Sequence, residues 1–234
     1  MNDTFSYTIR RNPRMTRIRL TIRHGEVRIS APVSASNSII EQFLRQHHAW
    51  IMQKLAAFRQ IQNKIPRYEY IHGEKFPLLG KQYTLVIQEG TRKSLLLKVI
   101  DDQIVIWLPA EIKHGDRAKT IRTAIINWYR KQAVDIFTQR TSFYNCFYGF
   151  SYQKIFIRNQ KTRWGSCSAN GNLSYNYRLL LAPLNILDYV VVHELVHLKE
   201  KNHGRNFWHL VAAQIPDYKE RRLWLKQNGH TLVI

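Results

Sequence analysis

The segment HELVHLKEKNHGRNFW, residues 193–208, has the residue types and the spacing of a zinc hydrolase. His193 and His197 are four positions apart, so their imidazoles lie on one face of a helix and can bind the same metal ion. Glu194 can reach a water molecule on that ion, and a catalytic zinc site keeps a position open for such a water. The apolar run at 186–192 also allows a buried helix whose histidines form only hydrogen bonds. Buried His and Glu side chains are costly unless they are paired or metal-bound, which favours the metal site.

His203 is the third metal ligand that we predict. On a continuous helix it would lie about 9 Å further along the axis than His197, too far to bind the same ion. The helix must therefore end between the two histidines. Asn202 and Gly204 tolerate a left-handed turn, so they predict a helix end at this place.

Other polar residues near the motif have alternative or supporting roles. Glu200 is a rival third ligand, but one straight helix would spread it and the two histidines over about 10 Å. His209 is a second rival, in an apolar stretch where a packing or surface histidine is more common. Asp188 and Asp217 are acidic candidates for hydrogen bonds to the histidine ligands.

Length and composition fit one large or two small domains with a hydrophobic core, since 44% of the 234 residues are hydrophobic. No apolar run approaches the roughly 18 to 20 residues of a membrane span, and the N-terminus lacks the apolar stretch of a signal peptide. We therefore expect a cytoplasmic chain with no membrane partner. Cys146 and Cys167 are too few for a disulfide framework or a cysteine-based zinc site.

The formal net charge of +20 is the second unusual feature of the chain. Such a charge meets the electrostatic criterion for contact with DNA, RNA or another polyanion, and it equally suits a basic surface that serves solubility. No compact basic tail is present. The N-terminal arginines are the densest group, at Arg10, Arg11, Arg14, Arg17, Arg19 and Arg23.

Residues 1–110 read as an N-terminal β-rich region that includes one helix. The helix is predicted to begin after Ser36, a good N-cap, and to bury a stripe of apolar residues between Ile39 and Phe58. The last three strands are expected to form a meander. Alternating or β-branched residues predict the strands at 7–11, 16–23, 27–31, 83–88, 95–100 and 104–108.

Residues 111–234 read as the catalytic core. A long helix is predicted over 116–147, followed by a strand at 152–158. Asn170-Gly171 is a strong hairpin signal, and a two-residue type I′ turn there would pair Arg163–Ser168 with Leu173–Tyr177 in antiparallel fashion.

The first strand of this hairpin is a candidate substrate-binding edge. Gly165, flanked by Trp164 and Ser166, permits close approach of another backbone, which suits an extended peptide that adds as a further strand. An ordinary hairpin with a bulge at Gly165 is the alternative.

Several of these motifs together resemble the YgjP-like metallopeptidase family. They are TRWGSCS at 162–168, the apolar stretch 187–192 that leads into HELVHL, and Asn202-His203 followed by Phe207-Trp208. The resemblance runs from the Arg17–Leu20 strand to Trp224-Leu225. SprT-like and WLM proteases, which act on DNA-linked proteins, are related families that also carry zinc ligands on a helix.

The resemblance implies an α+β fold in which the N-terminal β-rich region precedes a minimal zincin-like core with an HExxH helix and a hairpin edge. It also implies metal ligation by His193, His197 and His203, with Glu194 as the general base. This agrees with the assignment made from the residues themselves.

We therefore expect a zinc metallopeptidase, with Zn²⁺ as cofactor and an extended or unfolded polypeptide as substrate, bound at Trp164, Gly165 and Ser166. Two alternatives remain. One is a protease recruited to nucleic acid by its basic surface, and the other is a non-catalytic, zinc-stabilised nucleic-acid-binding module. Glu194 favours catalysis, because a purely structural zinc site has no use for a carboxylate beside an open position.

Overall fold

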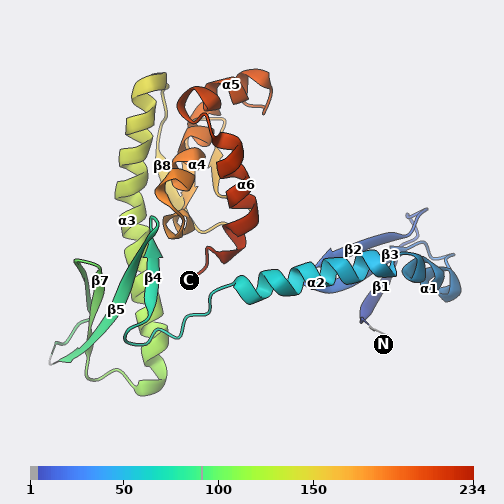
Figure 1. The fold of residues 1–234 in the computed structure, drawn as a ribbon, viewed down its shortest axis with the longest axis horizontal. Coiled ribbons are helices and arrows are strands. Elements are labelled where there is room, and N and C mark those ends of the chain that lie inside the picture. The colour runs from blue at the N-terminus through green and yellow to red at the C-terminus, as the bar shows by residue number, and fades with distance from the viewer. Residues whose placement is uncertain (1–4, 91) are drawn as a thin grey trace. The chain divides into compact units, whose positions relative to one another are not determined.

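The chain forms two compact units in the computed structural model, which describes residues 5–90 and 92–234 (Figure 1). The first unit ends at Ile65 and the second spans Pro66–Ile234, and each has its own buried core. The predicted boundary after residue 110 instead falls within the second unit. The reason is that Phe76, Leu85 and Ile104 pack in the same core as the helix that carries the histidine motif.

The N-terminal unit is a three-stranded sheet with two helices. The strands are β1 (Tyr7–Arg11), β2 (Arg19–Arg23) and β3 (Glu26–Ala31), in the order β1-β3-β2. The central β3 runs parallel to β1 and antiparallel to β2. Its alternate residues Val27, Ile29 and Ala31 are buried, because they face the core that the helices complete.

The single helix predicted after Ser36 is two helices, α1 (Asn37–Gln46) and α2 (His48–Lys64). Ser36 is the N-cap as predicted, and its hydroxyl accepts a hydrogen bond from the Ile39 amide. The break lies at His47, whose backbone is not helical and whose ring Nδ1 lies 2.8 Å from the Phe43 carbonyl oxygen. The apolar stripe continues across this break, which is why its periodicity did not reveal it.

The second unit begins with a four-stranded sheet in the order β4-β5-β7-β6. The strands are β4 (Lys75–Leu78), β5 (Lys81–Gly90), β6 (Leu96–Ile100) and β7 (Gln103–Pro109). The predicted meander is wrong, because β5 pairs with β7 in parallel and β6 lies at the edge. Burial explains this order: β7 is almost fully buried and takes an interior place, whereas β6 is largely exposed.

The long helix α3 (Arg117–Tyr148) matches its prediction closely. Its buried residues recur at helical spacing, and it ends where Gly149 adopts a left-handed conformation with φ of 63°. Phe137 of α3 stacks on Tyr175 with ring centroids 4.5 Å apart, and the Thr141 hydroxyl donates to the Tyr175 hydroxyl. These contacts join α3 to the small sheet described next.

The second sheet has the order β8-β10-β9 and places the predicted hairpin at its edge. Its strands are β8 (Ile155–Arg158), β9 (Gly165–Cys167) and β10 (Leu173–Asn176). The antiparallel pairing of β9 with β10 confirms the hairpin, but the two-residue type I′ turn is wrong. Gly171 is left-handed while Asn170 is not, and the Gly171 amide bonds to the Ser168 carbonyl at 3.0 Å, so the loop is longer.

Short 3-10 turns and three helices complete the mixed α+β unit. The turns are η1 (His114–Asp116), η2 (Tyr177–Leu181) and η3 (Gly229–Thr231), and the helices are α4 (Leu184–Val196), α5 (Arg205–Gln214) and α6 (Tyr218–Asn228). Ten of the 13 residues of α4 are buried, which makes it the central helix of this unit. Within the described part of the chain, no helix combines the length and the apolar character that crossing a membrane requires.

Candidate metal centre

The buried helix α4 carries the first two histidines at its C-terminal end. His193 lies in the last turn, and His197 is the C-cap residue. The helix ends in hydrogen bonds between residues three apart, which are typical of a 3-10 turn. The Leu198 amide donates to the Leu195 carbonyl and the Lys199 amide to the Val196 carbonyl, both at 3.0 Å. The helix therefore ends before His203, as the sequence predicted.

The predicted cause of this helix end is wrong. Neither Asn202 nor Gly204 is left-handed, and Gly204 has φ of −77° and serves as the N-cap of α5. A short loop follows α4 and carries His203 immediately before Gly204, the N-cap of α5.

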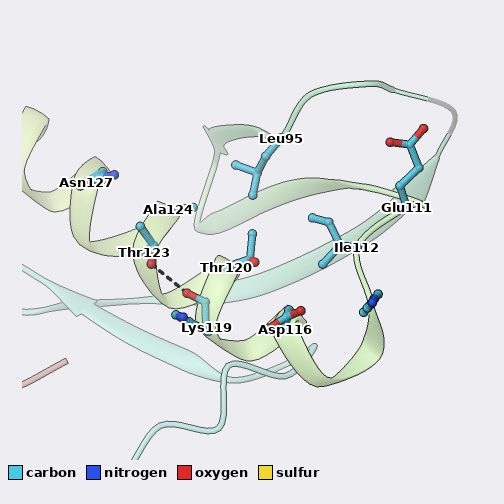
Figure 2. A pocket seen from close by; sticks show the side chains of 10 residues that line it. Leu95, Glu111, Ile112, Asp116, Lys119, Thr120, Thr123, Ala124 and Asn127 are labelled. Atoms are coloured by element: carbon cyan, nitrogen blue, oxygen red, sulfur yellow. Dashed lines mark hydrogen bonds between the residues drawn. The ribbon is translucent and has the colours of Figure 1, made fainter.

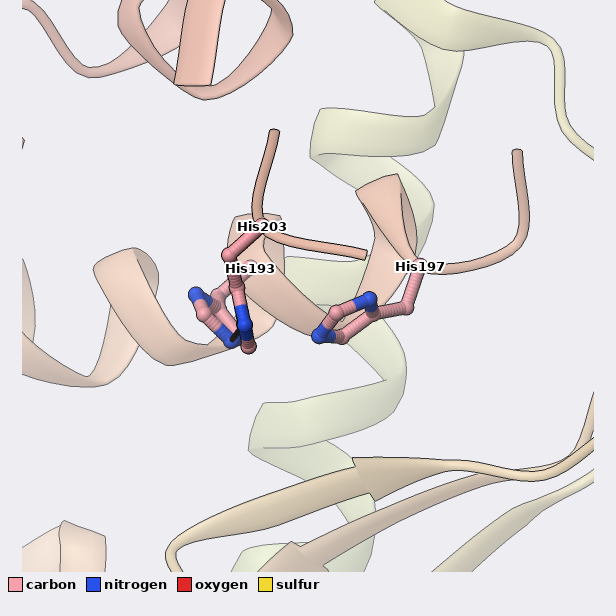
Figure 3. A group of neighbouring side chains, drawn as sticks. All are labelled: His193, His197 and His203. Atoms are coloured by element: carbon pink, nitrogen blue, oxygen red, sulfur yellow. Dashed lines mark hydrogen bonds between the residues drawn. The ribbon is translucent and has the colours of Figure 1, made fainter. Parts of the chain in front are cut away.

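The three histidines converge on one point (Figure 3). The Nε2 atoms of His193 and His203 are 3.0 Å apart, and the ligand atoms of all three histidines lie within 4.8 Å of one another. Nitrogen ligands at 2.0–2.1 Å from a tetrahedral zinc ion are about 3.3 Å apart, so the donor set fits a single ion. Neither Glu200 nor His209 belongs to this group.

The surroundings of His193 and His197 favour their neutral imidazoles, and the neutral form is the one that binds a metal. Burial, together with the nearby His197, His203 and Arg222, lowers the pKa of His193 to about 3. Burial also lowers the pKa of His197, although its contact with the Glu200 carbonyl opposes this. That contact joins His197 Nδ1 to the Glu200 oxygen at 3.0 Å and leaves Nε2 free to face a metal.

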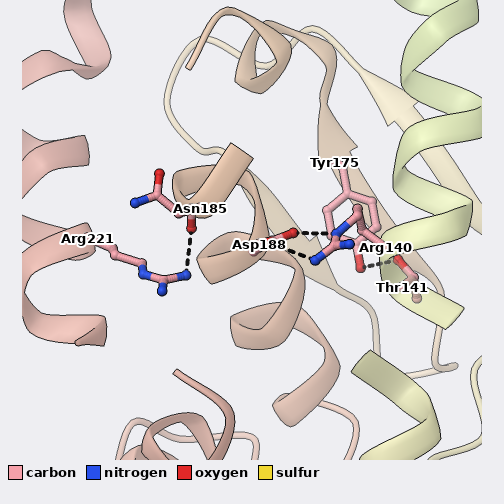
Figure 4. A network of polar contacts seen from close by, with 6 residues as sticks. All are labelled: Arg140, Thr141, Tyr175, Asn185, Asp188 and Arg221. Carbon is pink, nitrogen blue, oxygen red and sulfur yellow. Dashed lines mark hydrogen bonds and ion pairs between the residues drawn. The ribbon is translucent and has the colours of Figure 1, made fainter. Parts of the chain in front are cut away.

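Asp188 and Asp217, the acidic candidates for hydrogen bonds to the histidines, pair with arginines instead, and Figure 4 shows the pair of Asp188 with Arg140. Asp188 accepts two hydrogen bonds from Arg140 of α3, at 2.7 and 2.9 Å. Asp217 pairs with Arg221, which also donates to the Asn185 carbonyl at 3.0 Å. Arg140 joins α3 to α4, and Arg221 joins α6 to α4. The two aspartates therefore stabilise the packing of α4 through these arginines and do not orient the histidines. The Nδ1 atom of His193 is buried and has no hydrogen-bond partner within the described residues.

Glu194 lies beside the histidines with its side chain directed toward β9. It is 5% exposed, and burial raises the pKa of its carboxyl to about 8, which the positive charge of Arg163 partly opposes. Its Oε2 atom is buried without a hydrogen-bond partner in the described part of the chain. A buried, unpaired carboxylate is unfavourable on its own, so this atom is available to a ligand or to water.

Gly165 of β9 provides the space for this carboxylate. A Cβ atom at Gly165 would lie 2.6 Å from both Cγ and Oε1 of Glu194, which is closer than real contacts allow. Gly165 pairs regularly with Tyr175, so the alternative of a bulge at this position is wrong. The sequence predicted close approach of another backbone at Gly165, whereas the atoms that approach this glycine in the structure belong to the Glu194 side chain.

The other two predicted substrate-binding residues flank Gly165 on the edge strand. Trp164 packs over Gly229, and the guanidinium of Arg178 lies 5.5 Å from its ring centroid. Ser166 lies opposite Ser174 of β10. Within the described residues no further strand pairs with the other side of β9, whose three residues are partly exposed.

A basic pocket of about 360 Å³ adjoins the N-terminal end of β9. Its positive residues are Lys161, Arg163, Arg178 and Lys226, no Asp or Glu lines it, and His230 contributes a buried Nε2 atom without a hydrogen-bond partner among the described residues. The sequence analysis missed this pocket, because its residues come from three separate segments that only the fold brings together.

A larger hollow of about 710 Å³ lies away from the histidines, between Leu95, η1 and the start of α3 (Figure 2). Its polar side chains include Thr123, whose hydroxyl donates to the Lys119 carbonyl at 2.9 Å. No His or Cys lines this hollow, and the described residues provide no group of metal ligands there.

A helix that ends in a histidine pair, a third histidine from the following loop and a buried glutamate are features of a metallopeptidase. The model of the YgjP-like metallopeptidase domain matches residues 16–228, and the chain belongs to this family. This confirms the family resemblance found in the sequence.

Two further proteins are similar to parts of the chain. A 50-residue stretch is 46% identical to the UTP pyrophosphatase of Escherichia coli (strain K12), and the match covers 20% of this chain and 30% of that protein. The chain thus matches less than a third of that relative's length. The crystal structure of the metallopeptidase zymogen of Pyrococcus abyssi abylysin aligns with 38% of this chain and 93% of its own, at 23% identity and a TM-score of 0.35, too low to define a common fold.

Proposed function

We propose that this metallopeptidase hydrolyses peptide bonds with a zinc ion held by His193, His197 and His203 and with Glu194 as the general base. The convergence of the three imidazoles within 4.8 Å, beside a buried and unpaired carboxylate, carries this proposal. Zinc, when bound, lowers the pKa of a water molecule to about 7 and polarises the scissile carbonyl.

Glu194 accepts the proton of the attacking water and returns it to the leaving amine. Without a metal, burial favours its protonated form and gives the pKa of about 8. A cation held by the neighbouring histidines would favour the charged form of the carboxyl group and lower this pKa, and the charged carboxylate is the form that accepts a proton. Gly165 keeps the carboxylate in place by leaving room for it.

The open side of β9 provides the binding site for an extended or unfolded polypeptide. The Asn176 amide bonds to the Trp164 carbonyl, and the Ser168 amide bonds to the Asn172 carbonyl. Because bonded and outward-facing residues alternate along an antiparallel edge, Gly165 and Cys167 direct their backbone groups outward. A substrate that pairs with these two residues runs past the Glu194 carboxylate.

Glu194→Gln tests this function. The amide is nearly isosteric but cannot accept a proton, so the variant should keep its zinc and lose about 10²–10⁴-fold in peptide hydrolysis. Zinc content by elemental analysis and cleavage of an unfolded polypeptide are the two measurements. Hydrolysis at the wild-type rate by the zinc-loaded variant would exclude Glu194 as the base, and absence of any hydrolysis in the zinc-loaded wild type would favour a non-catalytic zinc module.

Phosphoanhydride hydrolysis is a second candidate function. The name of the Escherichia coli relative suggests it, and the acid-free basic pocket beside β9 is the feature of this chain that favours it. Arg side chains suit phosphate groups because their planar donors match the phosphate oxygens. Release of pyrophosphate from UTP by the wild type, lost in Lys161→Ser/Arg163→Ser, would support this activity. Peptide hydrolysis without pyrophosphate release would exclude it.

A further inference from the structure

The sheet of the N-terminal unit has one face that its helices leave uncovered. Successive residues of a strand point to opposite faces, and Val27, Ile29 and Ala31 of β3 are buried in the core of this unit. The intervening residues of β3 therefore lie on the opposite face, where Glu26 and Arg28 are exposed.

Strand pairing arranges the residues of this face in three rows. The first row is Arg10, Ser30 and Arg19, the second is Thr8, Arg28 and Thr21, and the third is Glu26 and Arg23. Rows two residues apart along a strand are separated by roughly 7 Å. The three rows line a shallow hollow of about 520 Å³, which we call the arginine face.

The charge of the arginine face is largely uncompensated. Its one acidic residue, Glu26, pairs with Arg28 at 2.5 Å, and both side chains are more than half exposed. Arg10, Arg19 and Arg23 form no ion pair with any residue that the structure describes. Three free guanidinium groups therefore stand among hydroxyl groups on one surface.

We propose that the arginine face binds the phosphate backbone of a nucleic acid. Guanidinium groups bind phosphate oxygens through two parallel hydrogen bonds, and Thr8, Thr21 and Ser30 supply hydroxyl donors between them. The face has no aromatic residue on which bases could stack and no groove-reading helix, so binding is independent of sequence. This inference does not depend on the chemistry proposed for the metal centre.

The test compares two triple variants of the full chain with equal loss of charge. Arg10→Ser/Arg19→Ser/Arg23→Ser removes the unpaired arginines of the face. Arg45→Ser/Lys54→Ser/Arg59→Ser, the control, removes three exposed cations from α1 and α2. Binding to a labelled 20-base-pair DNA, and to RNA of the same length, is measured by fluorescence anisotropy over a series of salt concentrations.

The wild type should bind at low salt, with affinity that falls steeply as salt is added. Each lost phosphate contact lowers the slope of log affinity against log salt by about 0.9 for duplex DNA, so the face variant should lose about two to three units of slope and at least tenfold in affinity. The control variant should lose less than one unit. Circular dichroism should show that both variants are folded, and their zinc content should equal that of the wild type.

Two results would overturn the proposal. If the wild type does not bind DNA or RNA at about 50 mM salt, nucleic acid is excluded as the partner of the arginine face. Equal losses of affinity in the two triple variants would show that binding depends on the net charge of the protein and not on the arginine face. Vesicles that contain phosphatidylserine provide a further arm, and binding to them but not to DNA or RNA would assign the face to an anionic membrane surface instead.

Discussion

At the residue scale, the contact between Gly165 and Glu194 links the proposed substrate-binding edge to the proposed general base. Both residues stand out in the sequence, Glu194 within the histidine motif and Gly165 within the hairpin. Their proximity does not, because it results from the packing of β9 against α4. The glycine is required here for space and not for an unusual backbone angle, since its φ is not in the left-handed region.

Gly165→Ala should therefore impair catalysis without removing the metal. The added methyl group displaces the Glu194 carboxylate, whose Cγ and Oε1 would lie only 2.6 Å away. Because a misplacement of about 1 Å can cost on the order of 10²-fold in rate, we expect kcat to fall at least tenfold while zinc content is unchanged. Gly115→Ala is the matched control, since a Cβ there meets nothing within 4 Å. A Gly165→Ala variant with normal kcat would show that the carboxylate can shift without consequence.

The third ligand can be assigned by a pair of alanine variants. His203 lies 3.0 Å from His193 through their Nε2 atoms, whereas His209 is exposed on α5. Elemental analysis should give about one zinc ion per chain for the wild type and for His209→Ala, and strongly reduced occupancy for His203→Ala. Zinc loss in His209→Ala with retention in His203→Ala would reverse the assignment.

At the scale of secondary structure, the edge strand β9 can be tested through its backbone. Cys167 directs its amide away from β10, so proline at this position removes an outward donor and leaves the pairing with β10 intact. One lost hydrogen bond is worth about 0.5–1.5 kcal/mol, so KM for an unfolded polypeptide should rise about 2- to 13-fold in Cys167→Pro. Cys167→Ala keeps the amide and should keep the wild-type KM. An unchanged KM in the proline variant would mean that substrates do not pair with this edge.

Local patterns predicted the elements more reliably than their arrangement. The periodicity of α3 and the alternation in β1 and β3 depend on residues close in sequence, and they predicted these elements closely. The parallel pairing of β5 with β7 depends on which strand is most buried in the finished sheet, and adjacent strands in the sequence suggested a meander instead. The break at His47 was hidden for a related reason, because both helices bury the same continuous stripe.

In the candidate site, too, local features were predicted from the sequence, whereas contacts between distant segments were not. The spacing of His193, Glu194 and His197 on one helix is local, and the sequence alone proposed their common role. The partner of Asp188 was not predictable from local spacing, because Arg140 lies on α3, 48 positions away in the sequence. Asp217 pairs with Arg221 four positions later, a local pair that the helical spacing of α6 indicates. The basic pocket beside β9 was missed because its residues are distant in the sequence.

At the scale of the whole molecule, the chain divides into its two units after Ile65 and not after residue 110 as the sequence predicted. Residues 1–65 carry eleven Lys and Arg against three Asp and Glu, so the unit with the arginine face is strongly basic. The family match at 16–228 includes most of this unit as well as the metal centre. The nucleic-acid binding and the metal centre proposed above would together make this chain a hydrolase that acts close to a polyanion.

The separation of the two cores predicts that the second unit folds without the first. None of the buried residues around the metal centre belongs to the N-terminal cluster, and the second unit contains all three histidines, Glu194 and β9. A fragment of residues 66–234 should therefore unfold cooperatively, bind about one zinc ion and retain the peptide hydrolysis of the full chain, because burial in its own core stabilises it. Thermal unfolding, elemental analysis and cleavage of an unfolded polypeptide test this, with Glu194→Gln in the same fragment as the control. A fragment that is unfolded or free of zinc would show that the N-terminal unit is needed to build the metal centre.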